Sequence, residues 1–192
     1  MLIDVPERIE TARLVLRPPG RGDGAALNAA VLASRERLAL WLPWARETPS
    51  LSDSEAYCRR QHAKFVLRED LTLLMLARDP AGGEGGESGE GEIVGATGLH
   101  RLDWRLRTFE VGYWLREGHE GRGLMTEAVV ALAGAAFERL AARRVEIRCD
   151  PANTRSWRVA ERAGFAFEGT LHRDSATPAG APRDTRVYAR VR

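Results

Sequence analysis

The feature that most constrains this chain is a glycine-rich stretch at residues 118–126, which lies between a strand-like run at 109–115 and a helix-like run at 124–140. Glycines within it permit tight or positive-φ backbone and leave no Cβ to keep a ligand away from the main chain. The helix that follows begins with unpaired N–H groups and the positive end of its dipole. A strand, a glycine-rich loop and a helix N-terminus in this order predict a site for a pyrophosphate or nucleotide-like ligand.

Two common phosphate-binding motifs do not fit this loop. An NTPase loop ends in Gly-Lys-Ser/Thr, whereas Gly123 is followed by Leu124. A dinucleotide fingerprint needs a small residue for close helix packing at the position where Thr126 stands. The loop therefore indicates a phosphate-containing ligand but does not identify which one. The rest of the chain is needed to identify it.

Length and composition favour one compact domain over residues 1–192. A chain of 192 residues can bury a sizeable core. The net charge is only +2, so we expect neither a direct nucleic-acid partner nor a membrane surface. The two cysteines, Cys58 and Cys149, are far apart in sequence, and no run reaches transmembrane length. Residues 1–6 do not resemble a signal peptide, so we expect a cytoplasmic protein.

The apolar patterning predicts a mixture of strands and helices. Seven strands are expected, at 9–17, 71–77, 93–102, 109–115, 145–149, 165–171 and 185–191. Helices are expected after Asp23 as a cap, at 52–69 after a Ser52–Glu55 capping box, at 124–140, and at 154–162 between Asn153 as N-cap and Gly164 as stop. Residues 79–92 are rich in Gly and Glu, which predicts a flexible hairpin loop.

Four stretches together carry a resemblance to a known family. They are ETARLVLR at 10–17, LWLPW at 40–44, EVGYWL at 110–115 with the glycine loop after it, and NTRSWRVAERAGF at 153–165. In this order they resemble the GNAT superfamily of N-acetyltransferases over nearly the whole chain, and within it the Rim-type (RimJ/RimL-like) branch of ribosomal-protein N-terminal acetyltransferases. The loop departs from the family's Gln/Arg-x-x-Gly-x-Gly/Ala motif at Glu120 and Met125.

The resemblance implies an α/β (α+β) fold, a mixed and strongly bent sheet of about seven strands with helices on both faces. It also implies acetyl-CoA as co-substrate, no metal, and a cleft where the strands at 109–115 and 145–149 splay apart. Unpaired backbone there suits the pantetheine arm as an added strand. The implied cofactor-binding residues are Tyr113, Trp114, Leu115, Gly121, Arg122, Gly123, Leu124, Met125, Thr126 and Asn153.

Acyl transfer to an amine needs a base, an oxyanion donor and a proton or hydrogen bond for the departing thiolate. The resemblance implies Glu110 as base, with Asp174 as second candidate because Rim-type enzymes can place a carboxylate near that position. The alternative for Glu110 is an ordinary strand residue paired with an arginine. Ser156 is the implied thiolate donor, and its alternative is a first-turn helix serine. Many family members use a tyrosine instead, and the sequence has none near Ser156.

The acceptor remains open at this level. We expect direct attack in a ternary complex by a primary amine, first of all a protein N-terminal α-amine, on an acceptor side lined by Trp41, Trp44 and His100. A polyamine, antibiotic or amino acid is the alternative acceptor, and a longer acyl-CoA such as succinyl-CoA the alternative donor. A non-catalytic acyl-CoA-binding module is the competing class. Dimerisation is common in the branch, so a homodimer is among the expected partners.

Overall fold

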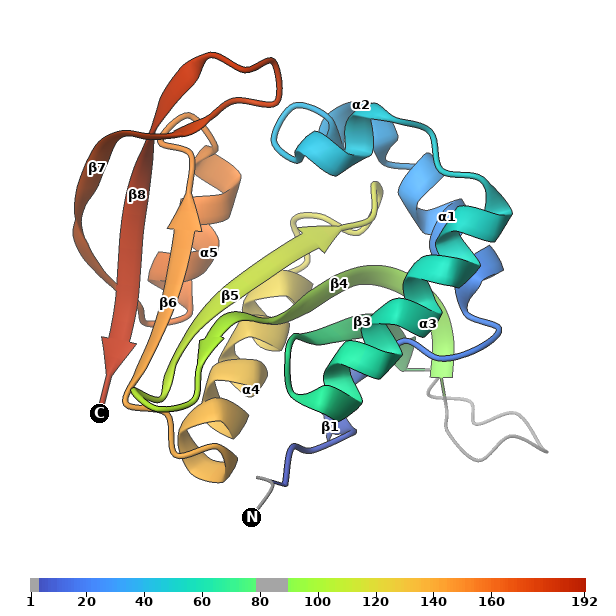
Figure 1. Ribbon diagram of the computed structural model, residues 1–192, viewed down its shortest axis with the longest axis horizontal. Coiled ribbons are helices and arrows are strands. Elements are labelled where there is room, and N and C mark those ends of the chain that lie inside the picture. Colours follow the sequence, from blue (N-terminus) through green and yellow to red (C-terminus); the bar gives the residue numbers. More distant parts are fainter. Residues whose placement is uncertain (1–3, 79–89) are drawn as a thin grey trace.

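The structure is a computed structural model that describes residues 4–78 and 90–192. In this part of the chain eight strands form one sheet in the order β1-β2-β3-β4-β5-β6-β8-β7 (Figure 1). Neighbouring strands are antiparallel except β5 and β6, which run parallel. The strands are β1 (Ile9–Glu10), β2 (Leu14–Arg17), β3 (Leu71–Arg78), β4 (Glu90–Asp103), β5 (Thr108–Leu115), β6 (Arg144–Cys149), β7 (Ala166–Ala176) and β8 (Pro182–Val191).

Helices cover both faces of the sheet (Figure 1). They are α1 (Gly24–Leu32), α2 (Arg35–Leu38), the 3-10 helix η1 (Pro43–Arg46), α3 (Leu51–Leu67), α4 (Leu124–Arg139) and α5 (Thr154–Arg162). Side chains of α4 and α5 pack in one apolar cluster with alternate residues of the central strands, and α1 and α3 contribute to a second cluster. The predicted fold class, a mixed sheet between helices, is confirmed, with eight strands in place of about seven.

Helix α4 sets the position of the glycine loop. Leu124, Ala128 and Leu132 recur at helical spacing and are buried against the sheet, where Phe109 and Val145 are buried as well. Burying a Leu, Val or Phe side chain stabilises a fold by about 1.5–3 kcal/mol. This contact holds the N-terminus of α4 close to the C-terminal end of β5. The glycine loop therefore lies at that end of the strand.

Three local predictions were wrong in detail. Residues 9–17 form two antiparallel strands, because the chain turns between Glu10 and Leu14 and pairs Glu10 with Val15. The capping box of α3 is formed by Ser50 and Asp53, two residues earlier than predicted. Asp23 is the N-cap residue of α1, but its side chain forms no cap hydrogen bond, because its carboxylate binds Arg17 at 2.7 and 2.8 Å instead.

The predicted flexible loop at 79–92 falls mostly outside the described residues. Its last three residues, 90–92, belong to β4 instead. Glu90 pairs with Arg78 in the sheet register, and its carboxylate accepts a hydrogen bond from Arg17 at 2.9 Å. The loop prediction was therefore wrong for Glu90, because its arginine partners lie far away in sequence.

A search of the described residues finds no helix that is both long and apolar enough to cross a membrane. The predicted absence of a transmembrane segment concerns the whole chain and stays a prediction for residues 1–3 and 79–89.

Candidate active site

Strands β5 and β6 separate shortly after they meet. They pair at Thr108, Phe109 and Glu110 of β5, and no pair follows Glu110. Residues 111–115 stay paired with β4 on their other side. Backbone groups on the β6 side of this segment thus face a gap, and an extended ligand that carries amides can hydrogen-bond to them as an added strand.

The glycine loop has the backbone that its sequence predicts. Gly118, Gly121 and Gly123 have φ of 87°, 75° and 78°, a region that residues with a Cβ rarely adopt. Gly123 is also the N-cap residue of α4, so the loop ends where the helix dipole begins. A Cβ at Gly118 or Gly121 would meet nothing within 4 Å, which shows that this side of the loop is open.

Glu110 stands at the vertex of the gap. Its side chain is 18% exposed, and Arg101 Nη1 lies 3.4 Å from its Oε2 atom. Among the described residues Oε2 accepts no hydrogen bond. Burial raises the pKa of the Glu110 carboxyl, and the charges of Arg101 and Arg148 only partly oppose this. A buried carboxylate with a raised pKa and an oxygen that accepts no hydrogen bond is better suited to accept a proton than an exposed glutamate.

On the other side of the gap, Ser156 contacts Tyr113. The Ser156 hydroxyl donates to Tyr113 Oη at 3.2 Å, and Tyr113 Oη donates to the Ser156 carbonyl at 2.9 Å. Asn153 Oδ1 accepts the Ser156 N–H at 3.1 Å, which confirms Asn153 as the N-cap of α5. Cys149 is buried nearby, and burial raises the pKa of its thiol to about 11, although a hydrogen bond with Ser156 opposes this.

A comparison with protein families identifies the family to which this chain belongs. The sequence model of the acetyltransferase (GNAT) domain matches residues 13–166. The chain belongs to the GNAT acetyltransferase family. Its splayed strands, glycine loop and α4 are therefore the equivalent elements of a GNAT acetyltransferase.

Curated relatives lie in the Rim-type branch, which confirms the resemblance. The chain is 33% identical over 172 residues to the "Putative ribosomal N-acetyltransferase YdaF" of Bacillus subtilis (strain 168), covering 87% of this chain and 85% of that protein. It is 35% identical over 102 residues to the ribosomal-protein-serine acetyltransferase of Escherichia coli (strain K12), covering 53% of this chain and 56% of that protein.

Solved structures agree in fold. RimL, a ribosomal L7/L12 α-N-protein acetyltransferase in complex with coenzyme A, superposes with a TM-score of 0.84 at 24% identity. The match covers 96% of this chain and 98% of RimL. The eight-stranded arrangement is therefore that of a GNAT domain.

In this GNAT domain the glycine loop is held by a contact that sequence reasoning missed. Glu127, in the first turn of α4, accepts from Thr11 Oγ1 at 2.6 Å, from Arg13 N at 2.9 Å and from Arg13 Nε at 2.7 Å. Arg13 Nη1 in turn donates to the Arg122 carbonyl at 2.8 Å. Burial alone would raise the pKa of Glu127, but these hydrogen bonds outweigh it and lower the pKa. An ionised Glu127 thus ties the loop to the β1–β2 turn.

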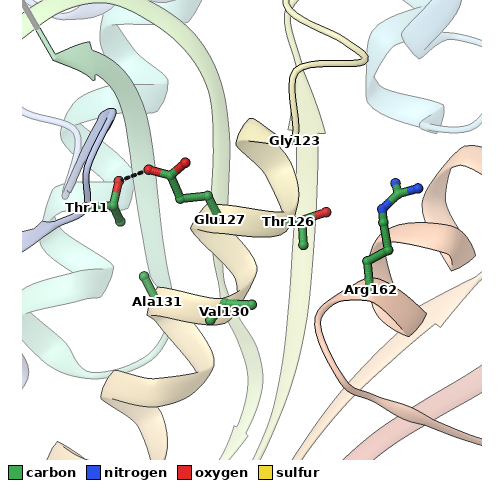
Figure 2. Close-up of a pocket in the computed structure, with 7 residues that line it drawn as sticks. All are labelled: Thr11, Gly123, Thr126, Glu127, Val130, Ala131 and Arg162. Carbon is green, nitrogen blue, oxygen red and sulfur yellow. Dashed lines mark hydrogen bonds between the residues drawn. The ribbon is translucent and has the colours of Figure 1, made fainter.

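A groove of about 560 Å³ begins next to this contact (Figure 2). It is lined by Thr11, Gly123, Thr126, Glu127, Val130, Ala131 and Arg162. Figure 2 shows Thr126 on α4 and Arg162 on α5, on opposite sides of the groove. Glu110 and Ser156 do not line it. The groove therefore extends the loop site along α4 without reaching Glu110 or Ser156. Arg162 is a cation that the sequence analysis did not single out.

The face of β5 that is turned away from α4 carries the residues expected on the acceptor side. Trp114 contacts Trp44 edge-on, with ring centroids 6.2 Å apart, and Trp44 is half exposed. His100 lies opposite Glu110 in the β4–β5 register. Trp41 is half-buried. The structure thus brings Trp44, Trp114 and His100 to one face of the sheet, and Trp114, expected as a cofactor contact through its backbone, has its side chain on the acceptor side.

Asp174, the second candidate base, has a different environment. It lies in β7, and its Oδ2 atom accepts a hydrogen bond from Arg148 at 2.8 Å. Hydrogen bonds from Thr185 and Arg148 lower the pKa of Asp174. A lowered pKa and a bound arginine suit a structural ion pair better than a base, so the geometry favours Glu110. Within the described residues, no three His, Cys, Asp or Glu side chains gather as a metal site requires.

The tyrosine expected to be missing near Ser156 is present in space. Tyr113 comes from β5, 43 residues earlier in the chain, and its hydroxyl reaches Ser156. Burial raises the pKa of the Tyr113 hydroxyl, so it stays protonated and can donate. The contact between β5 and α5 that brings the two hydroxyls together is not readable from either segment of the sequence alone.

Proposed function

We propose that this GNAT enzyme transfers an acetyl group from acetyl-CoA to the α-amine of a protein N-terminus. The observation that carries the proposal is the position of Glu110. It stands where β5 and β6 separate, with the glycine loop at the far end of the gap, and it shares its face of β5 with Trp114, which contacts Trp44. A donor in the gap and an acceptor on that face can therefore both reach one carboxylate.

The donor site is proposed from the loop outward. N–H groups at 121–125 and the Arg122 side chain hold the pyrophosphate, at the positive end of the α4 dipole. Thr126 and Arg162 line the groove that continues along α4, which suits the phosphorylated end of the cofactor. Backbone of Tyr113, Trp114 and Leu115 pairs with the amide-bearing arm, and Asn153 borders the same gap.

The chemistry is proposed as direct attack in a ternary complex. Glu110 accepts the proton of the amine, directly or through water, and main-chain N–H near Leu115 stabilises the oxyanion. Ser156 donates a hydrogen bond to the departing thiolate, for which its O–H turns from Tyr113 Oη toward the sulfur. Cys149 remains a neutral thiol because burial raises its pKa to about 11, which supports direct transfer over an acyl-cysteine intermediate.

A protein N-terminus is the preferred acceptor for two reasons. Its α-amine has a pKa of about 8, against about 10.4 for lysine, so a buried glutamate can deprotonate it more readily. The curated relatives are named for ribosomal proteins, one of them for the serine of such a protein. Ribosomal proteins are made in the cytoplasm, so the proposal implies a cytoplasmic enzyme. The predicted homodimer stays a prediction.

The test measures free CoA thiol released from acetyl-CoA with two acceptor pools. One pool holds short peptides with Ser, Ala or Met N-termini, and the other holds polyamines and aminoglycosides. We expect release with the peptides, and we expect Glu110→Gln to lower it by about 10²-fold or more while acetyl-CoA affinity is kept. Asp174→Asn is the matched control and should stay near wild type. Release with the small amines alone would refute the protein acceptor.

A further inference from the structure

A hydrogen-bonded Asp70–His100 pair lies beside Glu110 and is not used by the chemistry described above. His100 Nδ1 is 2.7 Å from Asp70 Oδ2, and Asp70 Oδ1 accepts from Thr72 Oγ1 at 2.6 Å. Thr72 is buried in β3, two residues after Asp70. Both carboxylate oxygens are thereby engaged, so Asp70 holds the imidazole in one orientation.

The ionisation of Asp70 fixes which ring nitrogen is available. Burial alone would raise the pKa of the Asp70 carboxyl, but the hydrogen bonds from His100 and Thr72 and the charge of the imidazole outweigh it and lower the pKa. An ionised carboxylate can only accept hydrogen bonds, so Nδ1 of His100 carries a proton. Nε2 is then the nitrogen that can take up and release a proton.

The sheet is shaped so that this nitrogen lies over β5. Gly98 of β4 and Gly112 of β5 face each other in register, and His100 lies across them. A Cβ on Gly112 would come within 2.8 Å of Cδ2 and 3.0 Å of Nε2 of the ring, and a Cβ on Gly98 within 3.1 Å of Cε1. The two glycines therefore leave room for the ring. Nε2 lies over Gly112, which is between Glu110 and Trp114 on the same face of β5.

Glu110 needs a way to lose the proton that it accepts, because it is largely buried. The arginines near it, Arg101 and Arg148, cannot accept a proton. Glu146, its partner in β6, is bound by Arg144 at 3.0 Å. His100 is the cross-strand partner of Glu110 in β4, and its side chain is 32% exposed. The imidazole thus connects the buried carboxylate with solvent.

We infer that Asp70 and His100 form a proton relay that regenerates Glu110 in each catalytic cycle. The amine N–H bond breaks as the Glu110 O–H bond forms, and the proton then passes from Glu110 to Nε2 of His100, directly or through water. Because Asp70 holds the Nδ1 proton, Nε2 itself then gives the transferred proton to solvent. Asp70 acts through His100 as a positioning residue. The inference rests on the proposed amine acetylation.

The experiment compares His100→Ala, His100→Gln and Asp70→Asn with wild type, using a peptide acceptor and acetyl-CoA. We expect kcat to fall about 10- to 100-fold in both His100 variants and less in Asp70→Asn. Kd for acetyl-CoA should stay within about threefold, because the relay does not contact the donor, and kcat should fall by more than the peptide KM rises, because His100 borders the acceptor side. Added imidazole should restore turnover of His100→Ala in a saturable way and should not restore Glu110→Gln.

His62→Gln is the matched control, since His62 contacts the Pro19 carbonyl on the α3 side and should leave turnover unchanged. Thermal unfolding checks that each variant is folded, and His100→Gln serves if His100→Ala is not. A folded His100 variant with wild-type kcat, a loss confined to KM, or a fall in kcat that imidazole does not reverse would each overturn the relay. An inactive wild type would instead overturn the proposed function, and the relay with it.

Discussion

At the scale of single residues, Glu110 combines two properties that oppose stability. Its carboxylate is largely buried, and its Oε2 atom accepts no hydrogen bond within the described chain. Burial is the main cause that raises its pKa. Buried, unsatisfied carboxylates cost folding free energy, and they are tolerated at sites where a proton must move.

This yields a pH-dependent stability prediction for Glu110→Gln. The folded pKa lies above the ordinary value of 4.5, so between the two values the unfolded chain binds fewer protons and stability falls as pH rises. Glutamine removes that loss. We expect Glu110→Gln to have a higher Tm than wild type at pH 8 and a similar Tm at pH 4. A Tm difference that is independent of pH would contradict the environment described for Glu110.

Asn153 can be tested as a cap separately from its proposed cofactor role. Loss of an N-cap side chain costs about 1 kcal/mol, so Asn153→Ala should lower the free energy of unfolding by about that amount in urea titrations. Asn153→Asp keeps an oxygen that accepts the Ser156 N–H and should be close to wild type in stability. Equal destabilisation by both substitutions would show that the cap is not what stabilises α5.

At the scale of elements, the glycine loop depends on a turn more than a hundred residues away in sequence. Glu127 in α4 and Arg13 in the β1–β2 turn are 114 positions apart and share two hydrogen bonds. Arg13 also reaches the Arg122 carbonyl within the loop. The loop backbone is therefore held by the first strands of the sheet as well as by its own glycines.

We predict that Glu127→Ala loosens the loop and weakens the donor site. KM for acetyl-CoA should rise by roughly tenfold, equivalent to about 1.4 kcal/mol, because the loop must then be ordered on binding. The peptide KM should change little. Glu138→Ala removes an exposed carboxylate from the other end of α4 and serves as control in the same steady-state assay. An unchanged KM for acetyl-CoA in Glu127→Ala would exclude this role.

The same elements show which features of the fold and the site local sequence patterns can predict. The three loop glycines, α4 and the Asn153 cap were predictable because each depends on neighbours within a few residues. The prediction of a Ser52–Glu55 capping box was wrong because Ser50 and Asp53 have the same spacing. Only the structure shows which serine caps the helix. Contacts such as Tyr113–Ser156 depend on strand register, which no local pattern specifies.

At the scale of the whole molecule, two distant segments meet above the acceptor face. Arg46 of η1 donates a hydrogen bond to the Pro178 carbonyl in the β7–β8 turn. Figure 1 shows the α2 region beside this hairpin. Trp44, also in η1, contacts Trp114 of β5. Segments from the first and last quarters of the chain thus border the acceptor side together.

We predict that Trp44→Ala acts on the acceptor alone. A half-exposed indole that borders a peptide site contributes about 1–2 kcal/mol to binding, so the peptide KM should rise by roughly 5- to 30-fold. Calorimetry should find Kd for acetyl-CoA unchanged. Leu40→Ala removes another exposed apolar side chain from the neighbouring segment and should have little effect. A matching loss of acetyl-CoA affinity in Trp44→Ala would place Trp44 in the donor site instead.

The central claim is direct transfer between two ligands that are bound at the same time, the donor in the gap between β5 and β6 and the acceptor on the face of β5 that carries Glu110 and Trp114. The most direct measurement is the initial rate with acetyl-CoA and a Ser-terminal peptide varied together, alongside the intact mass of the enzyme after acetyl-CoA alone. The account predicts intersecting double-reciprocal lines and an unmodified enzyme, because the Cys149 thiol is buried and neutral. Parallel lines, or an enzyme that gains one acetyl group on Cys149, would contradict it.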